Sequence, residues 1–239
     1  IARFLEGKVM PFVYRNSKVI TVSESSKQAI LELGFGQRSD IAIVNPGVDL
    51  AKFKTDFRKS SKPSLVYVGR LKPYKSLDRL LKIVKKVRRE IPQLTLTIAG
   101  VGESKGDLEE LTRKLRLQKV VTFLGAVSEK TKVELFAKAW ALVQPSKIEG
   151  WGITIIEANA AGTTVVAADV PGLRHSVQNP HTGLLVTWDN EGKWVDAITK
   201  VLNDEKFREY LENNSKIWVK EFSWDKSSNK LMKLLKDSL

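Results

Sequence analysis

Two glutamates, Glu149 and Glu157, stand eight positions apart in the segment EGWGITIIEANAAG, whose other residues are mainly glycine and apolar side chains. A carboxylate is costly to bury in such surroundings unless a partner compensates its charge. Gly150 and Gly152 allow the backbone to approach a ligand closely, and a helix beginning near Ile153 would present free N–H groups and the positive end of its dipole. The segment therefore predicts a helix end that holds phosphate between two glutamates that accept hydrogen bonds from sugar hydroxyls.

A second group of charged residues follows an apolar strand in VGRLKPYKS, from Val68 to Ser76. Gly69 ends the strand, Arg70 and Lys75 supply two cations, and Ser76 is predicted to cap the next helix. Two positive charges beside a helix N-terminus are typical of a phosphate-binding site. In open α/β sheets ligands bind outside the carboxyl ends of the strands, which is where both segments fall. The alternative is that Arg70 and Lys75 are solvated loop cations.

Other chemistries are disfavoured by the residues that the chain contains. It has no cysteine, which excludes thiolate zinc sites, cysteine nucleophiles and disulfides, and it has no Asp-x-Asp pair of the kind that holds a metal on a diphosphate. The histidines, His175 and His181, are interpreted as surface or loop residues. Gly100, Gly102 and Gly106 nearly match the dinucleotide fingerprint, but their spacing is off by one and they follow the second strand of the domain. We therefore expect no metal and no cofactor.

The composition is that of a globular protein with an excess of positive charge. The 239 residues include 40 lysines and arginines against 27 acids, a formal net charge of +13. This balance favours an anionic partner, namely nucleic acid, an anionic lipid surface or a phosphorylated small molecule. A lysine-rich solvated surface is the alternative. No apolar run is long enough to span a membrane.

Apolar runs bounded by turn residues alternate with segments of helical periodicity, which is the pattern of βαβ units around a parallel sheet. Most of these runs are continuously apolar, as expected of strands covered on both faces. Strands are predicted at 18–22, 41–44, 65–69, 94–100, 120–125, 140–145, 164–168 and 183–186, and helices at 76–90, 105–116, 129–138, 153–161 and 192–202, with two more within 205–239. The fold class is therefore α/β, and the six strands from residue 65 onward form a doubly wound, Rossmann-like parallel sheet.

Pro46 and Gly47 open a polar stretch that is predicted to be a linker. It divides a short N-terminal piece from the Rossmann-like sheet, and a final helix follows Phe222–Trp224. The expected bounds are 1–44 for the last helix and strand unit of a preceding domain, 45–63 for the linker, 64–222 for the Rossmann-like domain and 223–239 for the C-terminal helix.

The order of the motifs resembles a known family. GRLKPYK, IAGVGE, VTFLG, EGWGITIIEANAAG, VVAADVPG and TGLLV follow one another as in the donor-binding half of the retaining, GT-B-fold glycosyltransferases called glycosyl transferases group 1, and the likeness runs from about residue 18 to the end. It implies a hexosyltransferase-type enzyme that binds a nucleotide-diphosphate sugar, a UDP- or GDP-sugar, and transfers the sugar to an acceptor hydroxyl with retention and without a metal. Ser76 departs from the pattern, since the family often has glycine there, and Thr164 stands where proline is common.

The resemblance also implies roles for individual residues. Arg70 and Lys75 would hold the diphosphate, Glu149 would contact hydroxyls of the transferred sugar, and Glu157 would hold the ribose; the first three are the catalytic candidates. No covalent glutamate intermediate is implied, because the leaving phosphate would assist the incoming hydroxyl. The further substrate-binding candidates are Gly69, Gly150, Trp151, Gly152, Ile153 and Thr154, and the nucleobase is expected against Thr122, Phe123, Leu124 and Gly125.

The family pattern further implies a separate N-terminal domain that supplies the acceptor site. Residues 1–44 resemble its last unit and 223–239 the helix that crosses back to it, so the chain alone is expected to bind donor without efficient transfer. Two alternatives stay open: a nucleotide-sugar epimerase of the same architecture, and a basic module that binds nucleic acid or membrane. The apolar, inward-reading strands disfavour nucleic acid. We expect a cytoplasmic protein, with contact to an anionic membrane surface or a lipid-linked acceptor at the inner face left open.

Overall fold

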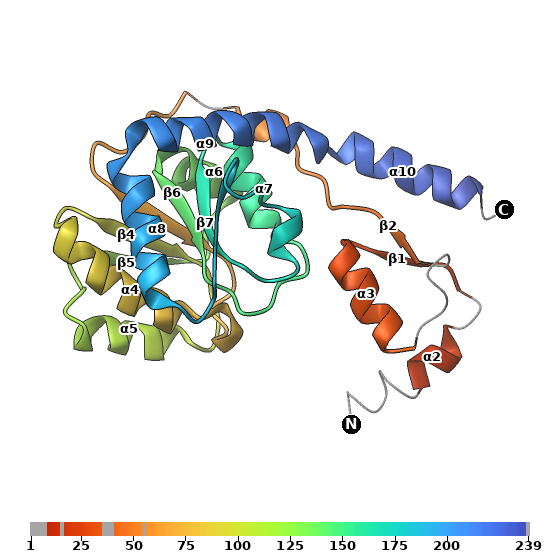
Figure 1. Ribbon diagram of the computed structural model, residues 1–239, viewed down its shortest axis with the longest axis horizontal. Coiled ribbons are helices and arrows are strands. Elements are labelled where there is room, and N and C mark those ends of the chain that lie inside the picture. The colour runs from red at the N-terminus through yellow and green to blue at the C-terminus, as the bar shows by residue number, and fades with distance from the viewer. Residues whose placement is uncertain (1–8, 15–16, 35–40, 55, 238–239) are drawn as a thin grey trace. The chain divides into compact units, whose positions relative to one another are not determined.

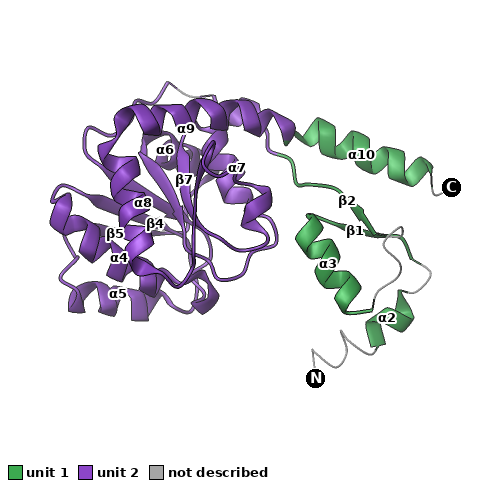
Figure 2. Ribbon diagram, in the orientation of Figure 1, with its two compact units in different colours: residues 1–47, 222–239 green, residues 48–221 purple. Residues whose placement is uncertain are grey.

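The computed structural model of the chain describes residues 9–14, 17–34, 41–54 and 56–237. The chain divides into two compact units (Figure 2). Residues 48–221 form the larger unit, and residues 1–47 together with 222–239 form the smaller one. The predicted site residues all belong to the larger unit.

The larger unit is built around a six-stranded parallel sheet (Figure 1). The order of the strands is β5-β4-β3-β6-β7-β8, so the direction of winding reverses between β3 and β6 and the sheet is doubly wound. This confirms the predicted fold class, and each predicted strand of the sheet overlaps an observed one. The strands are β3 (Ser64–Val68), β4 (Thr95–Ala99), β5 (Val121–Gly125), β6 (Ala141–Gln144), β7 (Thr164–Ala168) and β8 (Gly183–Val186).

Helices flank the sheet in two packed groups. The first consists of α4 (Leu77–Glu90), α5 (Lys105–Lys114) and α8 (Glu191–Asn203), and the second of α6 (Glu129–Lys138), α7 (Ile153–Ala160) and α9 (Glu205–Trp218). All residues of β6 and β7 are buried, because both faces of these strands are covered. The apolar stripe of α4 is buried as its helical periodicity predicts, through Leu77, Leu80, Leu81, Val84 and Val87.

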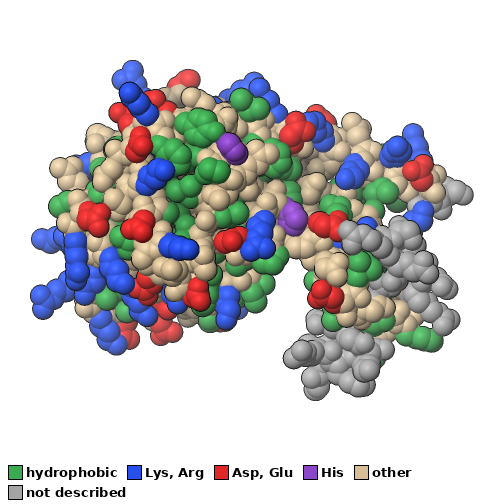
Figure 3. Space-filling model, in the orientation of Figure 1, with side chains coloured by type: hydrophobic (Ala, Val, Ile, Leu, Met, Phe, Trp, Pro, Cys, Tyr) green, Lys and Arg blue, Asp and Glu red, His purple; other side chains and the backbone are tan. Residues whose placement is uncertain are grey.

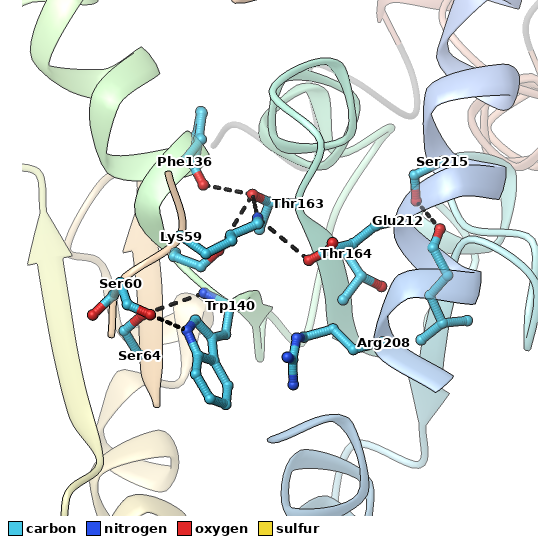
Figure 4. A network of polar contacts seen from close by, with 12 residues as sticks. Lys59, Ser60, Ser64, Phe136, Trp140, Thr163, Thr164, Arg208, Glu212 and Ser215 are labelled. Atoms are coloured by element: carbon cyan, nitrogen blue, oxygen red, sulfur yellow. Dashed lines mark hydrogen bonds and ion pairs between the residues drawn. The ribbon is translucent and has the colours of Figure 1, made fainter. Parts of the chain in front are cut away.

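A network of hydrogen bonds and an ion pair lies at the amino ends of β3, β6 and β7 (Figure 4). Lys59 Nζ donates to Thr163 Oγ1 at 2.7 Å and lies 3.3 Å from Glu212 Oε1 on α9. Trp140 Nε1 donates to the carbonyl oxygen of Ser60 at 2.7 Å. Burial lowers the pKa of Lys59 to about 8, although the charge of Glu212 opposes that shift. Residues 59 and 60, which fall in the predicted linker, therefore fasten the start of β3 to the rest of the unit.

Basic side chains are interspersed with acidic ones on the face shown in Figure 3, and they are most frequent at the edge formed by α4 and α5. A hollow of about 500 Å³ there is lined by five cations, which lie near the C-terminal ends of the two helices. Because Lys75 lies at the opposite end of α4, this part of the charge excess is remote from the predicted site. The cations are Lys85, Arg88, Arg89, Lys114 and Arg116.

The smaller unit contains a parallel pair of strands, β1 (Val19–Thr21) and β2 (Ile41–Ile43), with α3 (Glu24–Glu32) packed against both. It also holds α2 (Met10–Val13) and α10 (Trp224–Lys236). A Cβ on Gly47 would lie 2.5 Å from the backbone nitrogen of Trp224, so only glycine fits where the chain passes the start of α10. The assignment of this unit to a preceding domain stays a prediction. Within the described residues, no helix has the length and apolarity needed to cross a membrane.

Candidate functional site

The reversal of strand order brings the two predicted phosphate-binding segments side by side. β3 and β6 are neighbouring parallel strands, with Leu65 aligned to Ala141, so the loops that follow them leave the sheet at the same edge. The loop after β3 contains the 3₁₀ turn η4 (Pro73–Lys75) and leads into α4, and the loop after β6 leads into α7. A backbone hydrogen bond of 2.9 Å from Lys147 N to Tyr74 O ties the two loops together.

Lys75 and Glu149 form an ion pair between these loops. Their side chains are only 10% and 14% exposed. Gln144, the last residue of β6, donates from Nε2 to the same Glu149 oxygen at 2.7 Å. Two N–H donors therefore hold one oxygen of the carboxylate, which orients the side chain and compensates its charge. The partner that a carboxylate requires in this apolar segment is Lys75.

Gln144 was not among the residues predicted from the sequence. Its side chain is 1% exposed, it also donates to Ser146 Oγ at 3.2 Å, and its Oε1 is buried without a hydrogen-bond partner among the described residues. An amide that ends the apolar strand WALVQ is an available signal, because a buried amide needs several partners. Gln144 is therefore a polar support placed directly beside Glu149.

Arg70 and Lys75 of the first loop both contact Tyr74. Arg70 Nη2 donates to the Tyr74 hydroxyl at 2.8 Å, and Lys75 Nζ lies 5.1 Å from the centre of the Tyr74 ring. Tyr67, on β3, donates to the carbonyl oxygen of Arg70 at 3.0 Å, and burial together with the charge of Glu149 raises the pKa of Tyr67. Tyr67 therefore stays a neutral donor that supports the loop, while Arg70 remains exposed and able to reach a ligand.

Ser76 differs from its predicted role. It occupies the N-cap position of α4, but its backbone is left-handed, with φ 56° and ψ 35°, and its hydroxyl makes no cap hydrogen bond. A side-chain cap requires an extended backbone, so the prediction was wrong for a conformational reason. The hydroxyl instead accepts a hydrogen bond of 3.1 Å from Trp188 Nε1. The left-handed backbone also explains why glycine suits this position.

Glu157 lies about one turn into α7 and pairs with Lys132 of α6. Lys132 Nζ is 2.7 Å from Glu157 Oε1, and each side chain is 14% exposed. The same Nζ lies 3.0 Å from Glu129 Oε2. Burial raises the pKa of Glu157, and the hydrogen bond and charge of Lys132 oppose that rise. Glu149 and Glu157 therefore each have a cation of their own, and Lys132 was not predicted from the sequence.

Glycines allow the loops to close around the N-terminus of α7. Gly152, the N-cap residue, has φ +86°, and a Cβ there would lie 2.6 Å from the Leu173 side chain. A Cβ on Gly172, in the loop after β7, would lie 1.9 Å from the carbonyl oxygen of Glu149. The backbone after β7 therefore rests directly against the backbone that carries Glu149. Gly162, with φ +77°, follows the end of α7.

The side chain of Trp151 is 6% exposed and stacks on His175, with ring centres 6.4 Å apart and planes 10° apart. His175 belongs to the 3₁₀ turn η5 (Leu173–His175), so this histidine supports the loop beside the candidate site. In the first turn of α7, Ile153 is exposed and Thr154 half-buried. Trp151 therefore offers a ligand its backbone more readily than its ring.

The nucleobase candidates lie on β5, an edge strand of the sheet. Thr122 and Leu124 are exposed, Phe123 is half-buried, and Gly125 ends the strand with φ +69°. These side chains are thus open to a ligand along the edge, and their role stays a prediction.

The glycines of the near-fingerprint have a packing role. A Cβ on Gly100 would lie 1.8 Å from the carbonyl oxygen of Gly69, and one on Gly102 would lie 2.2 Å from that of Leu71. The loops after β3 and β4 therefore touch through their backbones, which supports the position of Arg70. In the part of the chain that the structure describes, no group of three or more His, Cys, Asp or Glu side chains is arranged to hold a metal ion.

Comparison with known proteins places the chain in a family. Residues 50–218 match the family described as glycosyl transferases group 1. An uncharacterized glycosyltransferase of Methanocaldococcus jannaschii is 32% identical over 237 residues, which cover 93% of this chain and 60% of that protein. The D-inositol 3-phosphate glycosyltransferase of Rhodococcus erythropolis is 30% identical over 236 residues, which cover 92% of this chain and 53% of that protein. The chain thus spans between half and three fifths of the length of such relatives.

Solved structures share the fold. Anabaena HepE, in complex with UDP and glucose, matches with a TM-score of 0.87 at 21% identity, over 96% of this chain and 66% of that protein. Sucrose-phosphate synthase from Thermosynechococcus elongatus matches with a TM-score of 0.84 at 25% identity, over 96% of this chain and 60% of that protein. Because the family match covers well over half of the sequence and the fold agrees, the chain belongs to glycosyl transferases group 1, a family of GT-B-fold glycosyltransferases.

Proposed function

We propose that the chain binds the nucleotide-sugar donor of a retaining, metal-independent glycosyltransferase and presents its sugar to an acceptor hydroxyl. The observation that carries this proposal is the Lys75–Glu149 ion pair where the strand order reverses. A cation suited to the diphosphate touches a carboxylate suited to sugar hydroxyls. In a nucleotide-sugar the diphosphate is bonded directly to the sugar, so one ligand can contact both Lys75 and Glu149.

Arg70 and Lys75 are proposed to hold the diphosphate. Negative charge grows on the leaving diphosphate as the sugar–phosphate bond breaks, and fixed cations stabilise this charge most in the transition state. The positive end of the α7 dipole adds to the effect. Tyr74 contacts both cations before a ligand arrives, so they are already gathered. Two side-chain cations supply the neutralisation that a metal provides in other glycosyltransferases.

Glu149 is proposed to position the transferred sugar rather than to attack it. One of its oxygens is held by both Lys75 and Gln144, so the carboxylate is oriented and its charge is compensated. This arrangement favours accepting hydrogen bonds from hydroxyls over forming a covalent sugar–enzyme bond. Retention is then proposed to follow from a reaction in which the leaving phosphate assists the acceptor hydroxyl on the same face. Glu157 would hold the ribose.

The donor is proposed to be a UDP-hexose, with a GDP-hexose as the alternative. The HepE structure, which shares the fold, contains UDP and glucose. The site residues described above all serve the donor, whereas transfer also needs an acceptor hydroxyl held within about 3–3.5 Å of the anomeric carbon in a water-poor cleft. We therefore propose that the chain alone binds donor without efficient transfer and that an additional domain supplies the acceptor site.

Isothermal titration calorimetry tests this function. We expect UDP-glucose or GDP-mannose to bind, with the same affinity in the presence of EDTA, and ADP-glucose not to bind. Lys75→Met should weaken this binding, and Lys72→Met is its matched control. Lys72 lies in the same loop as Lys75, but it pairs with Glu103 at 2.8 Å and its side chain is 38% exposed. Binding to neither UDP-glucose nor GDP-mannose would refute the proposal. Loss of binding in EDTA that magnesium restores would refute its metal-independent part.

A further inference from the structure

Lys132 holds the carboxylate of Glu157 through only one of its oxygens. The 2.7 Å contact joins Nζ to Oε1, and the same Nζ lies 3.0 Å from Glu129 Oε2. In the described part of the chain, Glu157 Oε2 accepts no hydrogen bond, and it is not among the buried polar atoms that lack one. The geometry therefore leaves an open acceptor whose direction is set by the lysine.

An acceptor for two neighbouring hydroxyls works best as a carboxylate, because a protonated acid turns one of its oxygens into a donor. The side chain of Glu157 is largely buried, and burial favours the neutral form. A cation in hydrogen-bond contact favours the charged form and also fixes the orientation of the group. Lys132 supplies both effects at the position where a ribose would bind.

Lys132 also connects two helices that serve different parts of the site. α6 begins directly after the predicted nucleobase segment, and its start is fixed by Ser128, whose Oγ accepts from Thr131 N at 3.2 Å. Lys132 lies in the next turn and reaches across to α7, which packs against α6. The lysine thus links the helix that follows the base region to the helix that carries the ribose carboxylate.

We propose that Lys132 is a positioning residue for the donor, which holds Glu157 as an oriented carboxylate whose open oxygen accepts the ribose hydroxyls. This inference rests on the proposed function, since the role exists only if a nucleotide binds. A simple structural ion pair between α6 and α7 is the competing explanation. The two differ in one measurable respect: only a positioning role makes the effect of Lys132 depend on the ribose hydroxyls of the ligand.

The test is calorimetric titration of the chain with UDP and with 2′,3′-dideoxy-UDP, and with the corresponding GDP pair in parallel. The variants are Lys132→Met, Lys132→Gln and Lys132→Arg. Lys130→Met is the matched control, because Lys130 is exposed on the same helix and its removal changes the net charge equally. Circular dichroism and melting curves establish which variants fold. If Lys132→Met does not fold, Lys132→Gln takes its place in the titrations.

The wild type should bind UDP roughly tenfold more tightly than the dideoxy ligand, as loss of a charge-assisted hydrogen bond implies. In Lys132→Met and Lys132→Gln this ratio should fall to about twofold through weaker UDP binding, while the dideoxy affinity stays within about twofold of wild type. Lys132→Arg and the control should keep the wild-type ratio. If Lys132→Met and Lys132→Gln kept the wild-type ratio of UDP to dideoxy-UDP affinity, the role of Lys132 would be overturned and the proposed function would stand. Failure of the wild type to bind either nucleotide would overturn the proposed function, and this inference with it.

Discussion

Replacement of Lys75 by methionine should affect stability and donor binding through two separable causes. In the folded protein the lysine compensates the charge of Glu149, and the two side chains are only 10% and 14% exposed. In the proposed complex it also contacts the diphosphate. The second variant, Lys75→Met with Glu149→Gln, removes the ion pair as a whole and so separates the two effects.

The size of each effect follows from the contacts. Removal of one partner of a buried ion pair costs about 3–5 kcal/mol, and the residual exposure of the pair together with the Gln144 donor reduces this to about 2 kcal/mol for Lys75→Met. The double variant leaves no unpaired charge and should recover most of that loss. Loss of a hydrogen bond to a charged phosphate corresponds to about 1.5–3 kcal/mol, or roughly 10- to 150-fold in Kd for UDP.

Urea denaturation measures the first effect, and calorimetry with UDP and UDP-glucose the second. Lys75→Met and the double variant should show the same weak UDP binding although their stabilities differ. Glu149→Gln alone should bind UDP as the wild type does and bind UDP-glucose less tightly, because its proposed partner is the sugar. Lys72→Met should match the wild type in both assays. If UDP affinity returned to the wild-type value in the double variant, Lys75 would be a structural partner of Glu149 and no phosphate ligand.

Three further predictions concern local features of the fold. Ser76→Gly should relieve the left-handed backbone and lose the Trp188 hydrogen bond, and because each effect is about 1 kcal/mol, urea denaturation should show little net change. Trp188→Phe, which loses the hydrogen bond without relieving the backbone, should cost about 1 kcal/mol. A clear stabilisation in Ser76→Gly would mean that the hydrogen bond contributes nothing. Gly172→Ala should lower the free energy of unfolding by about 2–3 kcal/mol, because its Cβ would lie 1.9 Å from the Glu149 carbonyl oxygen, and an unchanged melting temperature would contradict that contact. Burial lowers the pKa of Lys59 from 10.5 to about 8, so between these pH values the unfolded chain binds a proton that the folded chain has lost. The free energy of unfolding should therefore rise by about 2–3 kcal/mol from pH 8 to pH 10.5. Lys59→Met should lack that rise, and identical pH profiles of the variant and the wild type would refute the assignment.

Much of the fold and the position of the site could be predicted because the signals are local. Continuous apolar runs identify strands covered on both faces, and helical periodicity identifies α4 before any contact is known. Parallel βαβ units place the residues after each strand at one edge of the sheet. The segments around Lys75 and Glu149 were therefore expected at the ligand-binding edge from their position in the chain alone.

The partners of the charged side chains could not be predicted, because each pair is made across the fold. Lys75 and Glu149 are 74 positions apart, and Lys132 and Glu157 are 25 apart, in a chain with 40 lysines and arginines. No local pattern distinguishes the lysine that faces a glutamate on the next helix from its exposed neighbours. Those choices depend on strand order and helix packing, which set the distance between residues that are remote in sequence.

Ser76 shows the same limit at the level of a single residue. Its type predicts a helix cap, and its position at the start of α4 is correct, but the turn formed by Pro73–Lys75 leaves its backbone left-handed and directs the hydroxyl to Trp188. Backbone conformation at such a junction depends on how the loop meets the sheet and on which distant side chain lies opposite. Local preference is worth about 1 kcal/mol here, and tertiary contacts of similar size can therefore override it.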